Sequence, residues 1–341
     1  MSKVIIGIHG LGNKPDKKTL TKWWLKSIRE GLRNNGKFFV RPKFELIYWA
    51  DVLNNNPLDE KIRDKNHPQH LEEKYVKGKK QIRSSAHPLR KRILDFVEEQ
   101  LDKIFLNEDL SINYSFISDM IIHKYFKDLE IYYTENCEDK DGIECFAKEI
   151  IRNRAAKIFK KYQKDEILLI AHSMGSIIAY DVLTFILPEF KVDTFVTIGS
   201  PLGMPIIIGK IAAEQKVKIH EKRKLRTPPG VMSNWYNFSD LEDKVAMIYD
   251  LNDNYDSNEN GIRAEDIIVS NNYEINGKKN PHKAYGYLRT LEIAEVINNF
   301  LIESKKPVVK WLYNLSGKSI SKLLNLKQNI FSSTKSFLKR I

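Results

Sequence analysis

The fold is decided by residues 166–180, which read EILLIAHSMGSIIAY. An apolar run ends at Ala171, and apolar residues at helical spacing begin at Ile177. This pattern predicts a buried strand, a very tight turn and a helix, with Ser173 at the apex of the turn. Such a turn lifts a serine hydroxyl out of the sheet and places it near the first N–H groups of the helix. The alternative is an ordinary strand-to-helix turn with a capping serine.

Two small residues flank Ser173, because Ala171 lies two positions before it and Gly175 two positions after it. They let the strand and the helix pass without a side-chain clash. The pentapeptide AHSMG resembles the nucleophile elbow of α/β-hydrolases, in a form that some bacterial lipases use. The usual form is G-x-S-x-G, and Ala171 is the departure from it. The resemblance implies that Ser173 is the nucleophile and that the amide of Met174 is one donor of an oxyanion hole.

The amino terminus carries a second part of this resemblance. An apolar run over residues 3–8 ends in His9-Gly10-Leu11-Gly12, and a strand followed by H-G-x-G resembles the oxyanion loop of lipases and esterases. Glycines let the backbone approach a substrate with its N–H groups pointing inward. By this resemblance the second oxyanion donor is the amide of Leu11. We expect His9 to orient the loop rather than to act as the catalytic base.

An acidic loop follows a predicted strand at residues 234–238. α/β-Hydrolases place their catalytic groups in the order Ser, Asp, His, so the resemblance implies that this loop supplies the acid. Asp243 is preferred, because the aliphatic Val245 would pack back beneath the loop. Asp240 is the alternative acid. A further alternative is that the segment is an acidic surface turn with no catalytic role.

His282 is the one histidine of the chain that follows the acidic loop. It lies in a loop before an amphipathic helix, where the resembled family places its base, and we predict that it activates Ser173. A solvated loop histidine is the alternative. His172 is a poor base, because adjacent side chains on a sharp turn point apart. Ser200 is a decoy nucleophile, since it lies in a Gly-Ser-Pro segment without the strand–turn–helix context.

Alternating apolar patterns predict an α/β fold with a mostly parallel sheet of about six strands and helices on both faces. Strands are expected near 3–9, 43–50, 166–172, 193–199, 232–238 and 265–270. Helices are expected near 19–34, 144–163, 175–187, 204–218 and 284–303. The resemblance covers 1–51 and 144–303. The insertion at 52–143 carries apolar stripes that predict a helical cap or lid over the site, with plain core packing as the alternative.

The composition limits the class of protein. The chain has 341 residues, of which 42% are apolar, enough for one large domain with insertions. No apolar run approaches the roughly 18 residues that span a membrane, and the first predicted strand leaves no room for a signal peptide. Cys137 and Cys145 lack metal-ligand spacing, so we expect reduced thiols and a cytoplasmic protein, with an adventitious disulfide as the alternative.

Residues 304–341 form a predicted basic tail. They contain nine Lys or Arg and no Asp or Glu, which accounts for most of the net charge of +12. Apolar residues at near-helical spacing alternate with the lysines, a pattern typical of an amphipathic helix at a membrane surface. Peripheral attachment to an anionic membrane and packing on the body or in an oligomer are equally favoured. Nucleic acid is disfavoured, because no RNA- or DNA-binding motif accompanies the charge.

Together these features imply a serine hydrolase that cleaves carboxylic esters, lipid esters included, through Ser173, His282 and Asp243. Neither a cofactor nor a metal is expected. An acyltransferase, a thioesterase or an amidase would use the same three groups. A non-catalytic scaffold at a membrane or a protein complex is the alternative from another class. The acyl chain and head group of the substrate are not specified by any motif.

Overall fold

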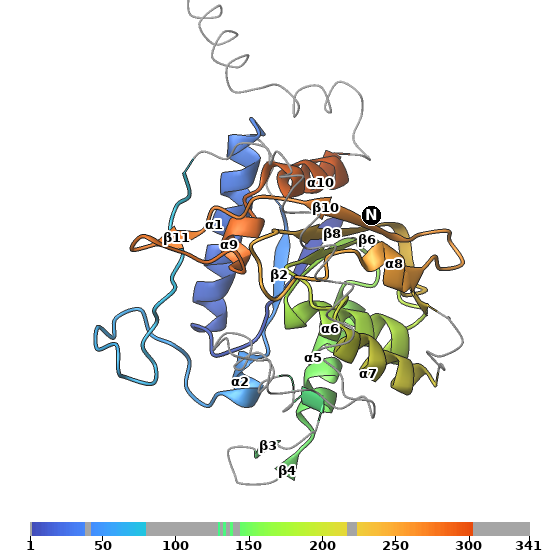
Figure 1. The fold of residues 1–341 in the computed structure, drawn as a ribbon, viewed down its shortest axis with the longest axis horizontal. Coiled ribbons are helices and arrows are strands. Elements are labelled where there is room, and N and C mark those ends of the chain that lie inside the picture. Colours follow the sequence, from blue (N-terminus) through green and yellow to red (C-terminus); the bar gives the residue numbers. More distant parts are fainter. Residues whose placement is uncertain are drawn as a thin grey trace, which may run out of the picture.

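The protein has an α/β fold around one six-stranded sheet. The computed structural model describes residues 2–37, 42–79, 129, 132, 133, 137, 138, 144–216 and 224–302. All six strands are parallel, in the order β10-β8-β6-β5-β1-β2 (Figure 1). Along the chain they are β1 Lys3–Ile8, β2 Phe44–Ile47, β5 Glu166–His172, β6 Val192–Ile198, β8 Val231–Ser239 and β10 Ala264–Ile268. The predicted α/β class and parallel sheet are confirmed.

β2 is shorter than the predicted strand at 43–50. Its last residue is Ile47. Two residues later, the backbone amide of Trp49 donates to the Nε2 atom of His9 instead of to a neighbouring strand. The short helix α2, Ala50–Leu53, then begins.

The remaining elements cover the sheet or decorate its edges. The longer helices are α1 Lys17–Asn34, α5 Ala147–Lys161, α6 Met174–Asp181 with its π-helical continuation η2 Val182–Ile186, α7 Pro205–Gln215 and α10 Leu291–Ile302. Two further short helices are α8 Leu251–Asn254 and α9 Ala284–Tyr287. Small two-stranded pairs are β3 Cys137–Glu138 with β4 Glu144–Cys145, β7 Leu225–Arg226 with β9 Tyr255–Asp256, and β11 Glu274–Ile275 with β12 Lys278–Lys279. The helix predicted at 284–303 is thus divided into α9 and α10.

Both faces of the sheet are buried, which explains the continuous apolar runs of its central strands. In β5, Ile167 and Leu169 belong to the core beneath α5, α6 and α7, whereas Leu168 and Ile170 belong to the core beneath α1, α9 and α10. Figure 1 shows these two groups of helices on opposite sides of the sheet. Each large apolar side chain buried there contributes roughly 1.5–3 kcal/mol.

The order of the strands defines where a ligand can bind. β1 pairs with β2 on one side and with β5 on the other, so the chain reverses direction across the sheet at β1. In open α/β sheets ligands bind outside the carboxyl ends of the strands at such a reversal. The segments that follow β1 and β5 begin at residues 9 and 173. They contain the predicted oxyanion loop and the predicted nucleophile turn.

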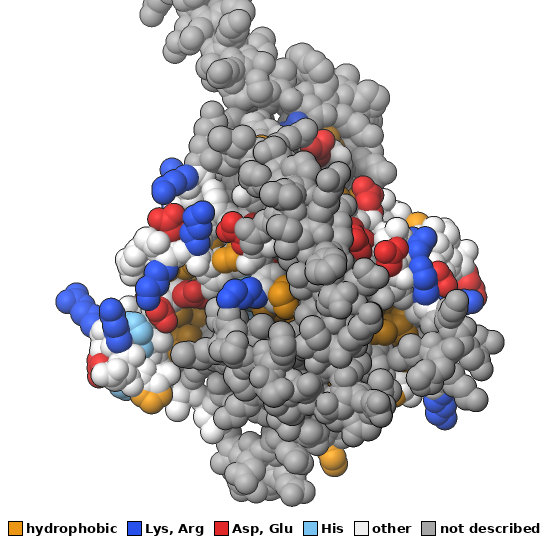
Figure 2. Space-filling view, in the orientation of Figure 1, with side chains coloured by type: hydrophobic (Ala, Val, Ile, Leu, Met, Phe, Trp, Pro, Cys, Tyr) orange, Lys and Arg blue, Asp and Glu red, His pale blue; other side chains and the backbone are white. Residues whose placement is uncertain are grey.

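The predicted cap and tail fall largely outside the described residues. Of the insertion at 52–143, residues 52–79, 129, 132, 133, 137 and 138 are described. Residues 54–79 among them contain neither helix nor extended strand. The apolar stripes at 89–105 and 112–125 lie outside the described residues, as does the tail at 304–341, so both remain predictions. None of the described helices combines the length and apolarity needed to cross a bilayer. Figure 2 shows acidic and basic side chains interspersed over the described surface of one face.

Candidate active site

Ser173 lies directly between β5 and α6, at the turn that the sequence pattern predicts. Its backbone has φ 55° and ψ −129°, a conformation that a residue with a side chain seldom adopts and that costs on the order of 1–3 kcal/mol. The turn is tight because α6 starts directly against β1. A Cβ atom on Gly175 would lie 2.6 Å from the carbonyl oxygen of Ile8. The strained turn therefore places the Ser173 hydroxyl at the carboxyl edge of the sheet.

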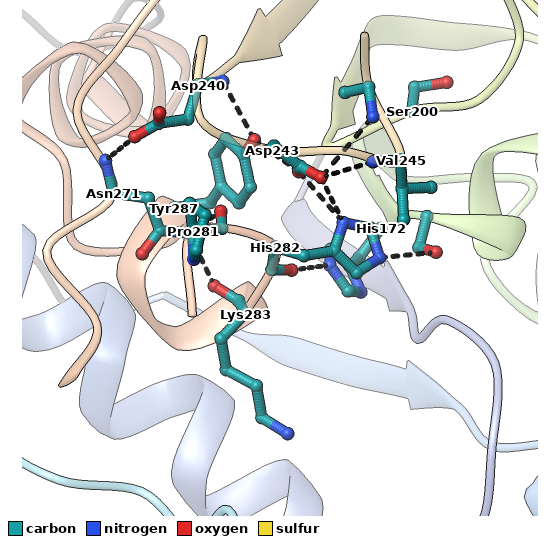
Figure 3. A network of polar contacts seen from close by, with 12 residues as sticks. His172, Ser200, Asp240, Asp243, Val245, Asn271, Pro281, His282, Lys283 and Tyr287 are labelled. Atoms are coloured by element: carbon teal, nitrogen blue, oxygen red, sulfur yellow. Dashed lines mark hydrogen bonds and ion pairs between the residues drawn. The ribbon is translucent and has the colours of Figure 1, made fainter. Parts of the chain in front are cut away.

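His282 lies between Ser173 and Asp243. Its Nε2 atom is 2.9 Å from Ser173 Oγ, and its Nδ1 atom is 2.9 Å from each oxygen of the Asp243 carboxylate (Figure 3). A carboxylate only accepts, so Nδ1 carries the proton and donates it in this hydrogen bond. In the neutral imidazole the Nε2 atom then carries no proton and accepts from the Ser173 hydroxyl. The structure thus brings the three predicted catalytic side chains into one hydrogen-bonded chain.

The carboxylate of Asp243 accepts hydrogen bonds from several donors. Its carboxylate accepts from the Val245 amide at 2.9 Å, the Ala246 amide at 3.4 Å and the Tyr287 hydroxyl at 2.7 Å, besides His282. Its side chain is buried, and so is that of Val245, which packs beneath the loop as expected. These donors hold the carboxylate in one orientation toward the imidazole (Figure 3).

Asp240, the alternative acid, faces away from the imidazole. It accepts from the backbone amides of Glu242 at 2.7 Å and Asn271 at 2.6 Å. The side-chain amide of Asn271 donates to the carbonyl oxygens of Pro281 and Lys283 at 2.6 and 2.9 Å. Burial raises the pKa of Asp240 above its ordinary value, although the two amides oppose the shift. Asp240 therefore holds Asn271, whose side chain in turn holds the main chain on either side of His282.

The loop after β1 lies directly against Ser173. A Cβ atom on Gly10 would lie 2.6 Å from Ser173 Cβ and 3.1 Å from its Oγ, so only glycine fits there. Within the described residues, neither the Leu11 nor the Met174 amide donates a hydrogen bond. These two predicted oxyanion donors come from the loop against Ser173 and from the first residue of α6.

His9 fixes this loop. It is buried, its Nδ1 atom donates to the Gly10 carbonyl at 2.8 Å, and its Nε2 atom accepts from the Trp49 amide at 3.0 Å. Burial, with Lys14 close by, lowers the pKa of His9 to about 3, so the ring is neutral. Because C=O and N–H point in opposite directions across a trans peptide, holding the Gly10 carbonyl turns the Leu11 N–H away from His9. These are the contacts of a histidine that orients its loop.

His172 contributes to the site in a way that its sequence position does not reveal. Its Nε2 atom donates to the carbonyl oxygen of His282 at 2.7 Å, and the two rings lie 4.8 Å apart. Burial, with the His282 ring next to it, lowers the pKa of His172 well below its ordinary value. A neutral His172 therefore holds the main chain of His282 and is no base for Ser173.

The Gly-Ser-Pro segment after β6 shapes the acid side of the site. Gly199 has φ 54°, and a Cβ atom there would lie 2.8 Å from Asp243 Oδ2 and 3.2 Å from His282 Nδ1. Ser200 is buried, with its hydroxyl 2.8 Å from that of Ser176, and it also accepts from the Leu202 amide. No imidazole contacts Ser200 among the described residues. Gly199 is a site residue that sequence reasoning missed; its one signal was a glycine directly after a strand.

Comparison with known protein families, curated proteins and solved structures finds no significant match for this chain. In the part of the chain that the structure describes, no group of three or more His, Cys, Asp or Glu side chains is arranged to hold a metal ion.

Proposed function

We propose that the protein is a serine hydrolase that cleaves carboxylic esters through an acyl-enzyme on Ser173. One observation carries the proposal: the unbroken hydrogen-bonded chain from Ser173 through His282 to Asp243, at the carboxyl edge of the sheet. A serine hydroxyl is a weak nucleophile until a base removes its proton, and the base needs an acceptor that fixes its tautomer.

We further propose that the sheet is that of an α/β-hydrolase. The nucleophile follows β5, the third strand of the sheet along the chain, the acid follows β8, and the base follows β10. This is the chain order Ser, Asp, His of that family. The positive φ of Ser173 supports the same proposal, because a strained strand-to-helix turn is the feature that exposes the family's nucleophile.

The proposed reaction has two stages. Ser173 Oγ attacks the ester carbonyl carbon while His282 Nε2 takes its proton, and the amides of Leu11 and Met174 donate to the oxyanion. Asp243 stays ionised and stabilises the imidazolium. His282 then protonates the departing alkoxide oxygen, the ester C–O bond breaks, and the acyl group remains on Ser173. In the second stage His282 deprotonates water, which attacks the acyl carbon. His282 then returns that proton to Ser173 Oγ as the acyl–oxygen bond breaks, which releases the acid and the free serine.

The test is hydrolysis of p-nitrophenyl esters of increasing acyl length by the wild type, Ser173→Ala and Ser200→Ala. The two serines are both buried at the same edge of the sheet, so Ser200→Ala is a matched control. We expect a burst of nitrophenol in the wild type and in Ser200→Ala, and none in Ser173→Ala. Wild-type rates in Ser173→Ala would overturn the proposal. Thioester, amide or alcohol-acceptor substrates then separate esterase from thioesterase, amidase and acyltransferase activity.

Lipid esters at an anionic membrane surface are the substrate class that the basic tail favours. The tail lies outside the described residues, so this part of the proposal rests on its sequence. Each Lys or Arg near an anionic surface is worth on the order of 1 kcal/mol. Full-length protein should sediment with anionic vesicles at low salt, and protein without residues 304–341 should not. Unchanged sedimentation of the truncated protein would contradict membrane attachment through the tail.

A further inference from the structure

An irregular segment, residues 71–79, runs along the edge of the molecule beside α1 and β11, and we call it the strap (Figure 1). It has no strand or helix, so side chains from other elements satisfy its backbone. Tyr273 donates its hydroxyl to the Lys74 carbonyl at 2.7 Å, and Asn272 donates to that of Lys79 at 2.9 Å. Leu71 is buried against the core beneath α1. The strap is therefore docked at several points along its length.

A buried charged pair holds the middle of the strap. Arg289 is wholly buried and lies 3.6 Å from the Glu30 carboxylate. Arg289 donates to the Val76 carbonyl at 2.7 Å, while Glu30 accepts from the Tyr75 hydroxyl at 3.1 Å and the Gly78 amide at 2.8 Å. Removing the strap would leave two buried charges without these partners, which is costly. Its docked position is thus specified by the core.

Glu73 connects the strap to the loop of the predicted base. Its Oε1 atom accepts from the Asn280 side-chain amide at 2.6 Å, and its Oε2 atom accepts from Lys283 Nζ at 2.7 Å. The Asn280 side chain in turn accepts from the backbone amide of His282 at 3.0 Å. Burial raises the pKa of Glu73, but Lys283 and the two hydrogen bonds outweigh it, so the pKa stays below its usual value. The ionised carboxylate therefore binds Asn280 and Lys283, one on each side of His282.

The loop has a second set of tethers that hold its carbonyl groups. Asn271 binds the carbonyl oxygens of Pro281 and Lys283, and His172 binds that of His282. Glu73 is the contact that acts, through Asn280, on the amide side of His282. The Nε2 atom of His282 must stay within hydrogen-bond reach of Ser173. A small shift of the His282 loop is therefore expected to slow the reaction without changing substrate affinity.

We propose that Glu73 is a positioning residue for His282, and that the strap is thereby part of the active site although it contributes no group to the chemistry. This inference rests on the proposed serine hydrolase function. Glu73→Ala should lower kcat by roughly 10- to 100-fold with KM within about twofold, because the carbonyl tethers remain. Glu73→Gln should be intermediate, since its amide oxygen can still accept from Asn280 but its NH₂ group cannot pair with Lys283.

Glu72 provides the matched control, because it is the neighbouring acid of the strap and its side chain is exposed. The experiment measures kcat and KM on the best ester for wild type, Glu73→Ala, Glu73→Gln and Glu72→Gln, normalised to the folded fraction from circular dichroism. A proton NMR spectrum of the hydrogen-bonded Nδ1–H of His282 is the second readout. The signal should broaden or shift in Glu73→Ala, change less in Glu73→Gln and stay unchanged in Glu72→Gln.

The outcomes separate the two proposals. Absence of Ser173-dependent activity in the wild type would contradict the proposed hydrolase function itself. If the wild type is active but Glu73→Ala keeps the wild-type kcat per folded molecule and an unchanged Nδ1–H signal, Glu73 has no positioning role. Equal losses in Glu72→Gln and Glu73→Ala would also refute it, because they would reflect only the loss of negative charge from the strap.

Discussion

Two histidine-bearing loops flank Ser173, and the two rings have the same tautomer but different hydrogen-bond partners. In the loop before α9, His282 Nδ1 donates to a carboxylate and Nε2 meets the serine hydroxyl. In the loop after β1, His9 Nδ1 donates to a backbone carbonyl and Nε2 accepts a backbone amide. His282 keeps 23% of its side chain exposed, whereas His9 is buried. Nε2 of His9 is already occupied by a backbone amide, whereas Nε2 of His282 faces the serine hydroxyl and its Nδ1 is bound to a carboxylate. These partners suit His282, and not His9, to act as a base.

The largest expected effect tests His282 directly. His282→Ala should lower kcat by roughly 10⁴–10⁶, because Ser173 then lacks a base and the leaving group lacks an acid. His67→Ala is the control, since His67 lies in an exposed surface turn. Steady-state hydrolysis of the best ester measures both. A loss of less than tenfold in His282→Ala would mean that His282 is not the base.

The next effect separates the two acids beside His282. Asp243→Asn should lower kcat by on the order of 10⁴, because the asparagine no longer fixes the tautomer of the imidazole. Asp240→Asn should cost less than about tenfold in kcat and about 1–3 kcal/mol in stability, since one of two buried amides loses its acceptor. Kinetics and urea unfolding of both variants give the ranking. The reverse order in kcat would move the acid to Asp240.

A smaller effect is expected on the His9 side. His9→Asn removes the Nε2 acceptor of the Trp49 amide while its side-chain NH₂ can still reach a nearby carbonyl. The Leu11 amide should then be less well aligned, and kcat should fall by roughly 10- to 100-fold, less than the loss of an entire oxyanion donor. Measured kcat and KM should show the change in kcat alone. An unchanged kcat would remove His9 and its loop from the site.

The smallest effect is a pH dependence of stability. His9 has its folded pKa lowered to about 3, so below the ordinary value of 6.5 the unfolded chain binds more protons than the folded protein. Stability from this residue is complete above pH 6.5 and falls as the pH drops toward 3. Between pH 7 and pH 5 the loss is about 2 kcal/mol. Urea unfolding gives the change in the free energy of unfolding between pH 7 and pH 5. This change should be smaller by about 2 kcal/mol in His9→Asn than in the wild type. Equal changes in the two proteins would contradict a buried neutral His9.

The sequence predicted the sheet well because burial on both faces leaves long apolar runs such as residues 167–171. It also predicted Ser173 and its turn, because the small residues there follow from steric contact between strand and helix. Asp243 was distinguishable from Asp240 through Val245, a local packing signal. In each of these cases the structural cause lies within a few residues of the feature.

The contacts that complete the site join residues far apart in the chain, which periodicity does not encode. Tyr287 resembled an ordinary apolar position of a helix, yet its hydroxyl donates to Asp243. Glu73 lay in a polar insertion with nothing local to connect it to Asn280 and Lys283. Gly199 gave no sign that a side chain there would collide with Asp243. Such partners follow only from the packed arrangement of the strands and loops.

Covalent labelling tests directly whether Ser173 is a nucleophile that His282 activates. Full-length protein is treated with a fluorophosphonate, and the adduct is located by mass spectrometry of its peptides. We expect one adduct per chain on Ser173. It should be retained in Ser200→Ala, form much more slowly in His282→Ala and be absent from Ser173→Ala. An unlabelled wild type, or a Ser173→Ala variant labelled as fast as the wild type, would contradict this expectation.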